Sequence, residues 1–250
     1  AITAYATSKS LKKFTKKGII SPEITYKDAE ALFGESKLKD QYYLFSSFYR
    51  EAAGEDVLIW HKDTVPFPRR INGKFAMLQR ILPDIQVFFF KDFAELSTDY
   101  WKDYLSHLSE YVVLENKHWF ETRHVGGGAP PIETKDGWLC IIHAVEETNR
   151  GRAYRAGAML LDINDPRKVI GKLHQPLFSP TEPWEVGNTK NFEGEVANVV
   201  FPTGTAVFGD DLYIYYGATD KRICVASLKI NELLNDLQNP SLGHQHGENQ

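Results

Sequence analysis

Carboxylates and aromatic rings gather in one stretch of the sequence, residues 182–204. It reads EPWEVG…FEGEVANVVFPTG, and its glutamates are Glu182, Glu185, Glu193 and Glu195. A sugar ring can stack its C–H face on an aromatic side chain such as Trp184 while its hydroxyls donate to carboxylates. The stretch therefore predicts sugar binding, although a solvated acidic loop is the alternative for any one of these glutamates.

Polar residues also stand where apolar, strand-like runs end. His143 follows GWLCII and precedes Glu146 and Glu147, Arg80 ends GKFAMLQR, and Asp220 follows the turn YYGAT. Ligand-contacting groups often gather at strand ends that open onto one mouth of a fold. We expect Arg80 and His143 to share a central pocket; the alternative for His143 is a hydrogen-bonded core histidine.

A glycine run, GGGAPPI at 126–132, follows the polar aromatic segment WFETRHV at 119–125. The run fits neither the dinucleotide fingerprint nor the P-loop pattern, so it predicts no phosphate loop of those kinds. Glycines allow a close approach of backbones, and the prolines make the following segment rigid and extended. A tight crossing between structural units is the alternative to a binding role.

Composition excludes several classes of partner. The 250 residues carry a net charge of −4 with a pI near 6.1, so no nucleic-acid or anionic-lipid partner is expected. Apolar runs are too short to cross a membrane. Cys140 and Cys224 lack metal-binding spacing and are expected to be buried, inert thiols. No metal or other cofactor is expected.

Repeated hairpin signals predict the fold. Polar turns followed by apolar runs occur at 73–80, 137–143 and 211–217, and each is followed by a second strand, at 86–93, 154–163 and 223–230. Residues 1–11 resemble a fourth second strand without its partner. Repeated antiparallel units of this length are typical of a β-propeller, with a flat sandwich as the alternative.

Helical periodicity interrupts the strand pattern at 35–52 and 99–114. We expect these segments to be helical insertions, on the outside of blades or at a contact in a homo-oligomer. A short amphipathic helix is expected at 230–237. We predict one catalytic domain over residues 1–238 and a polar tail over 239–250.

Taken in order, several motifs resemble those of glycoside hydrolase family 130. They are ATSKSLKKFTKKGII, KDAEALF, INGKFAMLQR, GGGAPPIETKDGWLCIIH, YRAGAMLLDINDP, NVVFPTG and YYGATD. The resemblance implies an all-β, five-bladed β-propeller, here with an incomplete first blade and short helical insertions. It also implies an inverting enzyme that acts on β-mannosides, as a phosphorylase or as a hydrolase.

The resemblance also assigns roles to single residues. The set that binds phosphate in the family's phosphorylases corresponds to Arg80, His143 and Tyr154, and more loosely to Lys27. At the position of a further lysine this sequence has His124. Asp28 and Asp220 match positions that contact the sugar.

Two features favour a hydrolase within this family. His124 is mostly neutral near pH 7 where a lysine would be a fixed cation, and Glu146 and Glu147 would repel phosphate. An inverting hydrolase needs a general base that activates water. We expect Glu146 in this role, with Glu185 second and Glu195 in reserve, on a β-1,2-mannoside oligosaccharide. A phosphorylase and a non-catalytic glycan-binding propeller are the alternatives.

The family's proton donor is an Asp in an EDPR-type motif, which this sequence lacks. An N-terminal segment absent from the sequence, or a catalytically inactive relative, would explain this, and we expect the former. The first residue is Ala1, so the sequence leaves the compartment open between periplasm and cytoplasm.

Overall fold

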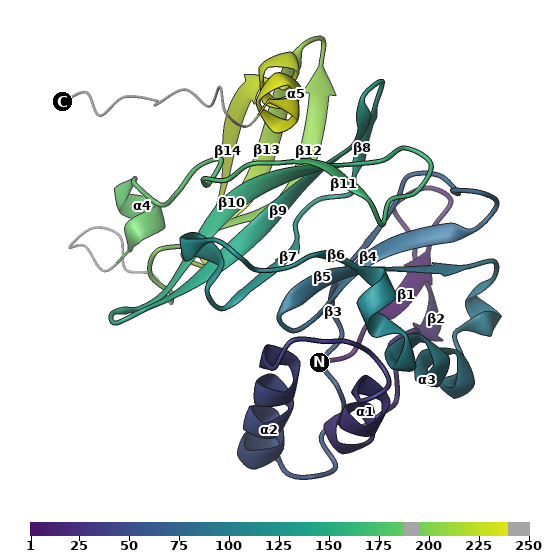
Figure 1. The fold of residues 1–250 in the computed structure, drawn as a ribbon. Helices are drawn as coiled ribbons and strands as arrows, with labels where there is room; N and C mark the ends of the chain where they lie inside the picture. Colours follow the sequence, from purple (N-terminus) through teal and green to yellow (C-terminus); the bar gives the residue numbers. More distant parts are fainter. Residues whose placement is uncertain (188–195, 240–250) are drawn as a thin grey trace. The chain divides into compact units, whose positions relative to one another are not determined.

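The computed structural model describes residues 1–187 and 196–239. The chain divides into two compact units, Ala1–Glu115 and Asn116–Gln250, and each is described by itself. Four antiparallel sheets account for most of the regular structure, so the protein is mostly β, as expected (Figure 1).

The first unit contains two of these sheets. β1 (Ala4–Thr7) pairs with β2 (Thr15–Ile19), and a four-stranded sheet has the order β3-β4-β5-β6. Its strands are β3 (Lys62–Pro66), β4 (Phe75–Ile81), β5 (Asp84–Phe90) and β6 (Val112–Leu114). The expectation of a long strand over residues 1–11 is wrong, because only four of these residues form a strand and they belong to an exposed hairpin.

Helices in the first unit occur close to the predicted places. The segment 35–52 overlaps α2 (Gln41–Ala53), and 99–114 overlaps α3 (Thr98–Ser106) and a short 3-10 turn (Leu108–Tyr111). The expectation of helix at the end of the second segment is wrong, because Val112–Leu114 forms β6 and pairs with β5. A further 3-10 turn spans Phe93–Glu95. Helix α1 (Tyr26–Phe33) was not predicted; it buries Tyr26, Ala29 and Phe33 in an aromatic-rich core.

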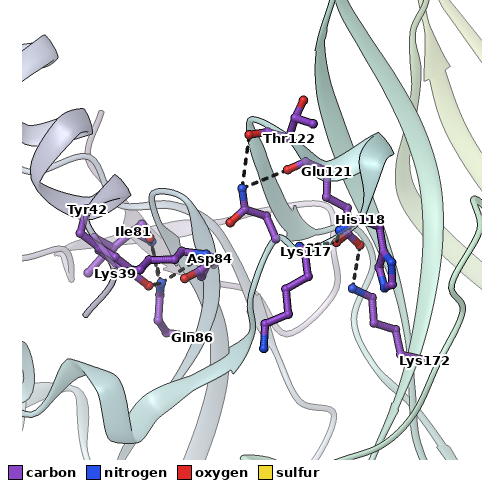
Figure 2. A network of polar contacts seen from close by, with 11 residues as sticks. Lys39, Tyr42, Ile81, Asp84, Gln86, Lys117, His118, Glu121, Thr122 and Lys172 are labelled. Atoms are coloured by element: carbon purple, nitrogen blue, oxygen red, sulfur yellow. Dashed lines mark hydrogen bonds and ion pairs between the residues drawn. The ribbon is translucent and has the colours of Figure 1, made fainter. Parts of the chain in front are cut away.

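A polar network closes the β4–β5 turn (Figure 2). Gln86 accepts a hydrogen bond from the Ile81 amide at 2.7 Å and donates to its carbonyl at 2.8 Å and to the Tyr42 hydroxyl at 2.9 Å. Lys39 pairs with the buried Asp84 at 2.6 Å. These contacts satisfy polar groups that would otherwise be buried unpaired, and they tie α2 to the sheet.

The second unit contains the other two sheets. One has the order β11-β10-β9-β7, with β8 also paired to β9, and the other has the order β12-β13-β14. Their strands are β7 (His124–Gly127), β8 (Ile132–Thr134), β9 (Gly137–Thr148), β10 (Gly151–Leu161), β11 (Val169–Lys172), β12 (Val200–Phe208), β13 (Asp211–Ala218) and β14 (Arg222–Lys229). The 3-10 turn η3 (Trp119–Glu121) precedes β7, α4 (Pro183–Val186) precedes β12, and α5 (Ile230–Gln238) follows β14.

The glycine run explains how β7 and β12 approach each other. A Cβ atom on Gly128 would lie 2.8 Å from the Ile141 carbonyl oxygen and 3.1 Å from the Cβ of Pro202 in β12. Only glycine avoids this clash, so the close approach expected from GGGAPPI is present. No helix in the described part of the chain is both long and apolar enough to cross a membrane.

His61 belongs to a buried polar network in the first unit. Its ring nitrogens contact the Thr3 hydroxyl, at 2.9 Å, and the side-chain oxygen of Gln79, and Gln79 donates to the Tyr104 hydroxyl at 3.0 Å. Burial disfavours the charged imidazolium and lowers the pKa of His61 from 6.5 to about 4. The folded protein therefore holds this histidine neutral.

We expect acid to destabilise the first unit through His61. Unfolded His61 takes up a proton near pH 6.5, whereas the folded residue does so only near pH 4. The contribution of His61 to the free energy of unfolding is therefore fully present above pH 6.5, and it is lost as the pH falls from 6.5 to about 4. The full loss is about 3 kcal/mol. Urea unfolding across this range measures it, and a His61→Gln variant with an unchanged pH slope would contradict the assignment.

Candidate active site

Three of the predicted site residues share one face of a sheet in the second unit. In the strand register His143 on β9 lies opposite Gly126 and Ala156, while Val145, two residues on, lies opposite both His124 and Tyr154. Directly opposed residues of antiparallel strands point to the same face, and residues two apart along a strand do too. His124, His143 and Tyr154 therefore project together.

Ring distances confirm this grouping. The ring centroid of His124 lies 5.9 Å from that of His143 and 6.5 Å from that of Tyr154. Phe201 of β12 joins the cluster, with its centroid 4.5 Å from His143 and 6.2 Å from Tyr154. Phe201 was not among the predicted site residues, although it lies in the motif NVVFPTG.

Burial within this cluster is graded. His143 is fully buried and His124 nearly so, while Tyr154 and Phe201 are partly exposed. Imidazole and phenol groups can donate hydrogen bonds to an oxyanion or to sugar hydroxyls, and a dry setting strengthens such bonds. The cluster therefore suits binding of an oxygen-rich ligand. It contains no carboxylate that could remove a proton from water.

Glu146 lies on the other face of β9. It is three residues from His143, an odd number, so the two side chains project to opposite sides of the sheet. Its carboxylate pairs with Arg155 of β10 at 2.6 Å. This placement gives no support to Glu146 as a base beside His143, and the ion pair offsets the negative charge expected to repel phosphate.

The charge of Glu147 is also offset. Its carboxylate lies 2.8 Å from Arg123 and 3.4 Å from Arg152. The side chain is half exposed, so these pairs are screened by water. The two neighbouring glutamates therefore do not form the anionic wall that favoured a hydrolase in the sequence analysis.

Both carboxylate oxygens of Glu185 accept hydrogen bonds from neighbouring groups. It is buried in α4, where one oxygen accepts hydrogen bonds from the amides of Thr181 (2.9 Å) and Glu182 (3.0 Å), and the other accepts one from the Tyr216 hydroxyl at 2.5 Å. Burial, and then the hydrogen bond to Glu185, raise the pKa of Tyr216. A carboxylate with three donors caps the helix and has little capacity left to activate water.

In the first unit, Arg80 lies in a charged cluster that the sequence analysis missed. The Nε of Arg80 is 2.9 Å from Asp63, and Lys62 is the cross-strand partner of Arg80 in β3. The Lys62 ammonium lies 4.4 Å from the centre of the Trp60 ring, and burial followed by the charge of Arg80 lowers the pKa of Lys62. In such a cluster the two cations can bind an anion, while the carboxylate accepts a hydrogen bond from a hydroxyl group of the ligand.

A charged triplet, HKD at 61–63, next to an apolar strand was the available signal for Lys62 and Asp63. Their positions follow from a β-bulge: the register of β3 shifts between Lys62 and Val65, where Asp63 has a φ of 53°. A bulge re-aims side chains next to functional sites, and its position is not readable from strand periodicity.

The remaining predicted residues are peripheral within their own units. Lys27 is exposed on α1, and Asp28, also exposed, accepts a hydrogen bond from the Thr25 hydroxyl at 2.9 Å at the start of that helix. Asp220 is exposed in the β13–β14 turn with a φ of 55°. Glu195, like Glu193, lies outside the described residues. In the described ranges no three His, Cys, Asp or Glu side chains come together as metal ligands.

Comparison with known proteins agrees with these motifs. Residues 8–239 match the family model Glyco_hydro_130, described as beta-1,4-mannooligosaccharide phosphorylase. A 1,2-β-oligomannan phosphorylase of Thermoanaerobacter sp. is 40% identical over 173 residues, covering 69% of this chain and 52% of that protein. A β-1,4-mannooligosaccharide phosphorylase of Ruminococcus albus is 32% identical over 201 residues, covering 79% of this chain and 56% of that protein.

The fold is also similar to a solved structure. The β-1,2-mannobiose phosphorylase of Listeria innocua, in complex with β-1,2-mannobiose, matches with a TM-score of 0.65 and 27% identity, over 94% of this chain and 53% of that one. The chain thus spans about half the length of the relatives that it matches. The family match covers nearly all of the chain, which therefore belongs to glycoside hydrolase family 130.

Proposed function

We propose that this chain is part of an inverting phosphorylase of β-1,2-linked mannooligosaccharides. Inorganic phosphate would attack the anomeric carbon of the terminal mannose, forming a C1–O bond to phosphate as the glycosidic C1–O bond breaks. The departing oligosaccharide oxygen takes up a proton. Inversion of the β-linkage gives α-mannose 1-phosphate and an oligosaccharide shorter by one unit.

The placement of the carboxylates carries this proposal. A hydrolase needs a carboxylate beside the reacting sugar to activate water, but Glu146 lies on the face of β9 opposite His143, where it pairs with Arg155, and Glu185 accepts three hydrogen bonds. A phosphorylase needs no such base, because phosphate is itself the nucleophile. Curated relatives with 40% and 32% identity are named as phosphorylases, which supports the same choice.

The cations of the chain are also consistent with an anionic co-substrate. His124 lacks the fixed charge of the lysine that it replaces, but Lys62 adds a cation beside Arg80. We propose that Arg80, His143 and Tyr154 keep the phosphate-binding roles implied by the family resemblance. His124 would then donate a hydrogen bond to phosphate in place of the lysine charge.

The fold proposed for the whole protein is a five-bladed β-propeller in which the sheets described above are blades. The match to the mannobiose phosphorylase over 94% of this chain supports it. This chain spans about half the length of the relatives that it matches, so the reaction proposed here is that of the whole protein that includes it.

The test is turnover of β-1,2-mannobiose and β-1,2-mannotriose by that protein, with and without inorganic phosphate. We expect α-mannose 1-phosphate to form only with phosphate, detected by phosphorus NMR, while cellobiose, as control, is not cleaved. Release of free mannose at the same rate without phosphate would show a hydrolase. Binding of mannobiose without either product would show a glycan-binding protein, and both outcomes contradict the proposal.

A further inference from the structure

Trp119 is an exposed indole that the protein holds in place. It is 51% exposed, yet its Nε1–H donates to the side-chain oxygen of Gln175 at 3.3 Å. The Arg155 guanidinium lies 5.0 Å from the centre of the ring, and Phe120 packs against it edge to face at 5.5 Å. A ring fixed in this way loses little freedom when a ligand stacks on it.

The base of the indole is fixed as well. Trp119 begins η3, and Glu121 at the end of this turn accepts hydrogen bonds from the amides of Lys117 (2.8 Å) and His118 (3.0 Å). Lys172 of β11 pairs with the other oxygen of Glu121 at 2.7 Å (Figure 2). The turn that carries Trp119 is therefore anchored to its own sheet.

Polar groups with remaining hydrogen-bond capacity surround the ring. Arg155 binds one oxygen of Glu146, and no described residue donates to the other oxygen. The amide nitrogen of Gln175 likewise has no partner in the described part of the chain, since only its oxygen accepts, from Trp119. An acceptor and a donor thus flank one aromatic ring.

The local charge favours a neutral ligand. The positive charge of Arg155 is balanced by the negative charge of Glu146, 2.6 Å away. This ion pair therefore gives no net attraction for an anionic or a cationic ligand. A flat apolar ring bordered by a carboxylate oxygen and an amide is complementary to a sugar, which has an apolar C–H face and a rim of hydroxyls.

We propose that Trp119, Glu146, Arg155 and Gln175 form a second mannoside-binding surface, which we call the Trp119 platform. It rests on the proposed function for the identity of the sugar. The platform differs from the His143 cluster because Glu146 and Arg155 project from the opposite face of β9 and β10. It binds units of a longer β-mannooligosaccharide and so favours chains over the disaccharide.

The test is a titration of the whole protein that includes this chain with β-1,2-mannotetraose, without phosphate, followed by its tryptophan indole N–H signals in nitrogen–proton NMR spectra. Trp119→Phe identifies the Trp119 signal. We expect that signal to shift on titration, and Trp119→Ala to weaken binding about tenfold. Phe208→Ala removes an aromatic side chain that is 67% exposed on another sheet, and it serves as the matched control with unchanged affinity.

Three outcomes would overturn the platform. The first is that only signals other than that of Trp119 shift on titration, and the second is that Trp119→Ala binds mannotetraose as tightly as the parent protein. The third is that maltotetraose shifts the Trp119 signal as much as mannotetraose does, which would remove the assignment to mannosides. Because phosphate is absent, the titration does not depend on turnover. Failure of the platform is thus distinct from failure of the phosphorylase, which the product assay decides.

Discussion

Replacing Arg80 with methionine is expected to lower kcat/KM for phosphorolysis by at least about a hundredfold, the loss typical when one donor to a developing or transferred negative charge is removed. Methionine keeps much of the aliphatic packing of the side chain, which is 9% exposed, while deleting the guanidinium. We expect most of the loss to appear as a higher KM for phosphate. Initial rates over a range of phosphate concentrations measure it.

Two further variants distinguish a loss of phosphate binding from a loss of folding stability. Methionine leaves the Asp63 carboxylate, which is 14% exposed, without its ion-pair partner and can destabilise the protein. The double variant Arg80→Met/Asp63→Asn removes that stray charge, and Arg80→Lys keeps a cation without the planar fork of donors. We expect Arg80→Lys to lose about tenfold. A drop in kcat/KM with an unchanged KM for phosphate, at an unchanged melting temperature, would contradict a role in phosphate binding.

Strand prediction succeeded where apolar runs are long and bounded by turns. The runs at 154–163 and 211–217 became β10 and β13 with shifts of one to three residues at their ends, whereas β9 begins with the run 137–143 but continues five residues beyond it. These strands are buried for much of their length, so burial alone produces a readable pattern. The exposed hairpin β1–β2 has no such pattern, and its first strand was overextended.

Helix α1 was missed although a local signal for it exists. Thr25 and Asp28 are spaced as in a capping box, and the Thr25 hydroxyl accepts a hydrogen bond from the Asp28 amide at 3.1 Å. The family resemblance assigns Asp28 to sugar contact, which stays a prediction. The structure places Asp28 at a helix start, and a test of capping positions would have predicted that helix.

For the candidate site, the residues involved were easier to predict than the directions in which their side chains point. The grouping of His124, His143 and Tyr154 was expected, and the structure places these residues together. The face of Glu146 could have been predicted as well, because a separation of three residues along a strand reverses the direction of the side chain. The position of Lys62 could not, because it depends on a bulge in β3, and that of Glu185 depends on a hydrogen bond from Tyr216, which is distant in sequence.

Replacing Glu121 with alanine is expected to lower the free energy of unfolding by about 3–5 kcal/mol. Glu121 is fully buried, and its removal leaves two amides without their acceptor and Lys172, only 14% exposed, without its anion. Glu121→Gln is the matched control, since its amide oxygen can still accept from the amides of Lys117 and His118. We expect it to lose about half as much. Urea unfolding, followed by tryptophan fluorescence, measures both.

A second measurement ties this loss to the charge of Glu121. Burial, and then the charge of Lys172, lower the pKa of His118, whereas Glu121 opposes that shift. Both variants remove the opposing charge, so the pKa of His118 should fall further in each, as proton NMR titration can record. A large loss of stability in Glu121→Ala with an unchanged His118 pKa would mean that the backbone hydrogen bonds alone hold η3, and that the ion pair with Lys172 contributes little. If both variants unfold like the parent protein, η3 is not anchored by Glu121, and the rigidity assigned to Trp119 loses its support.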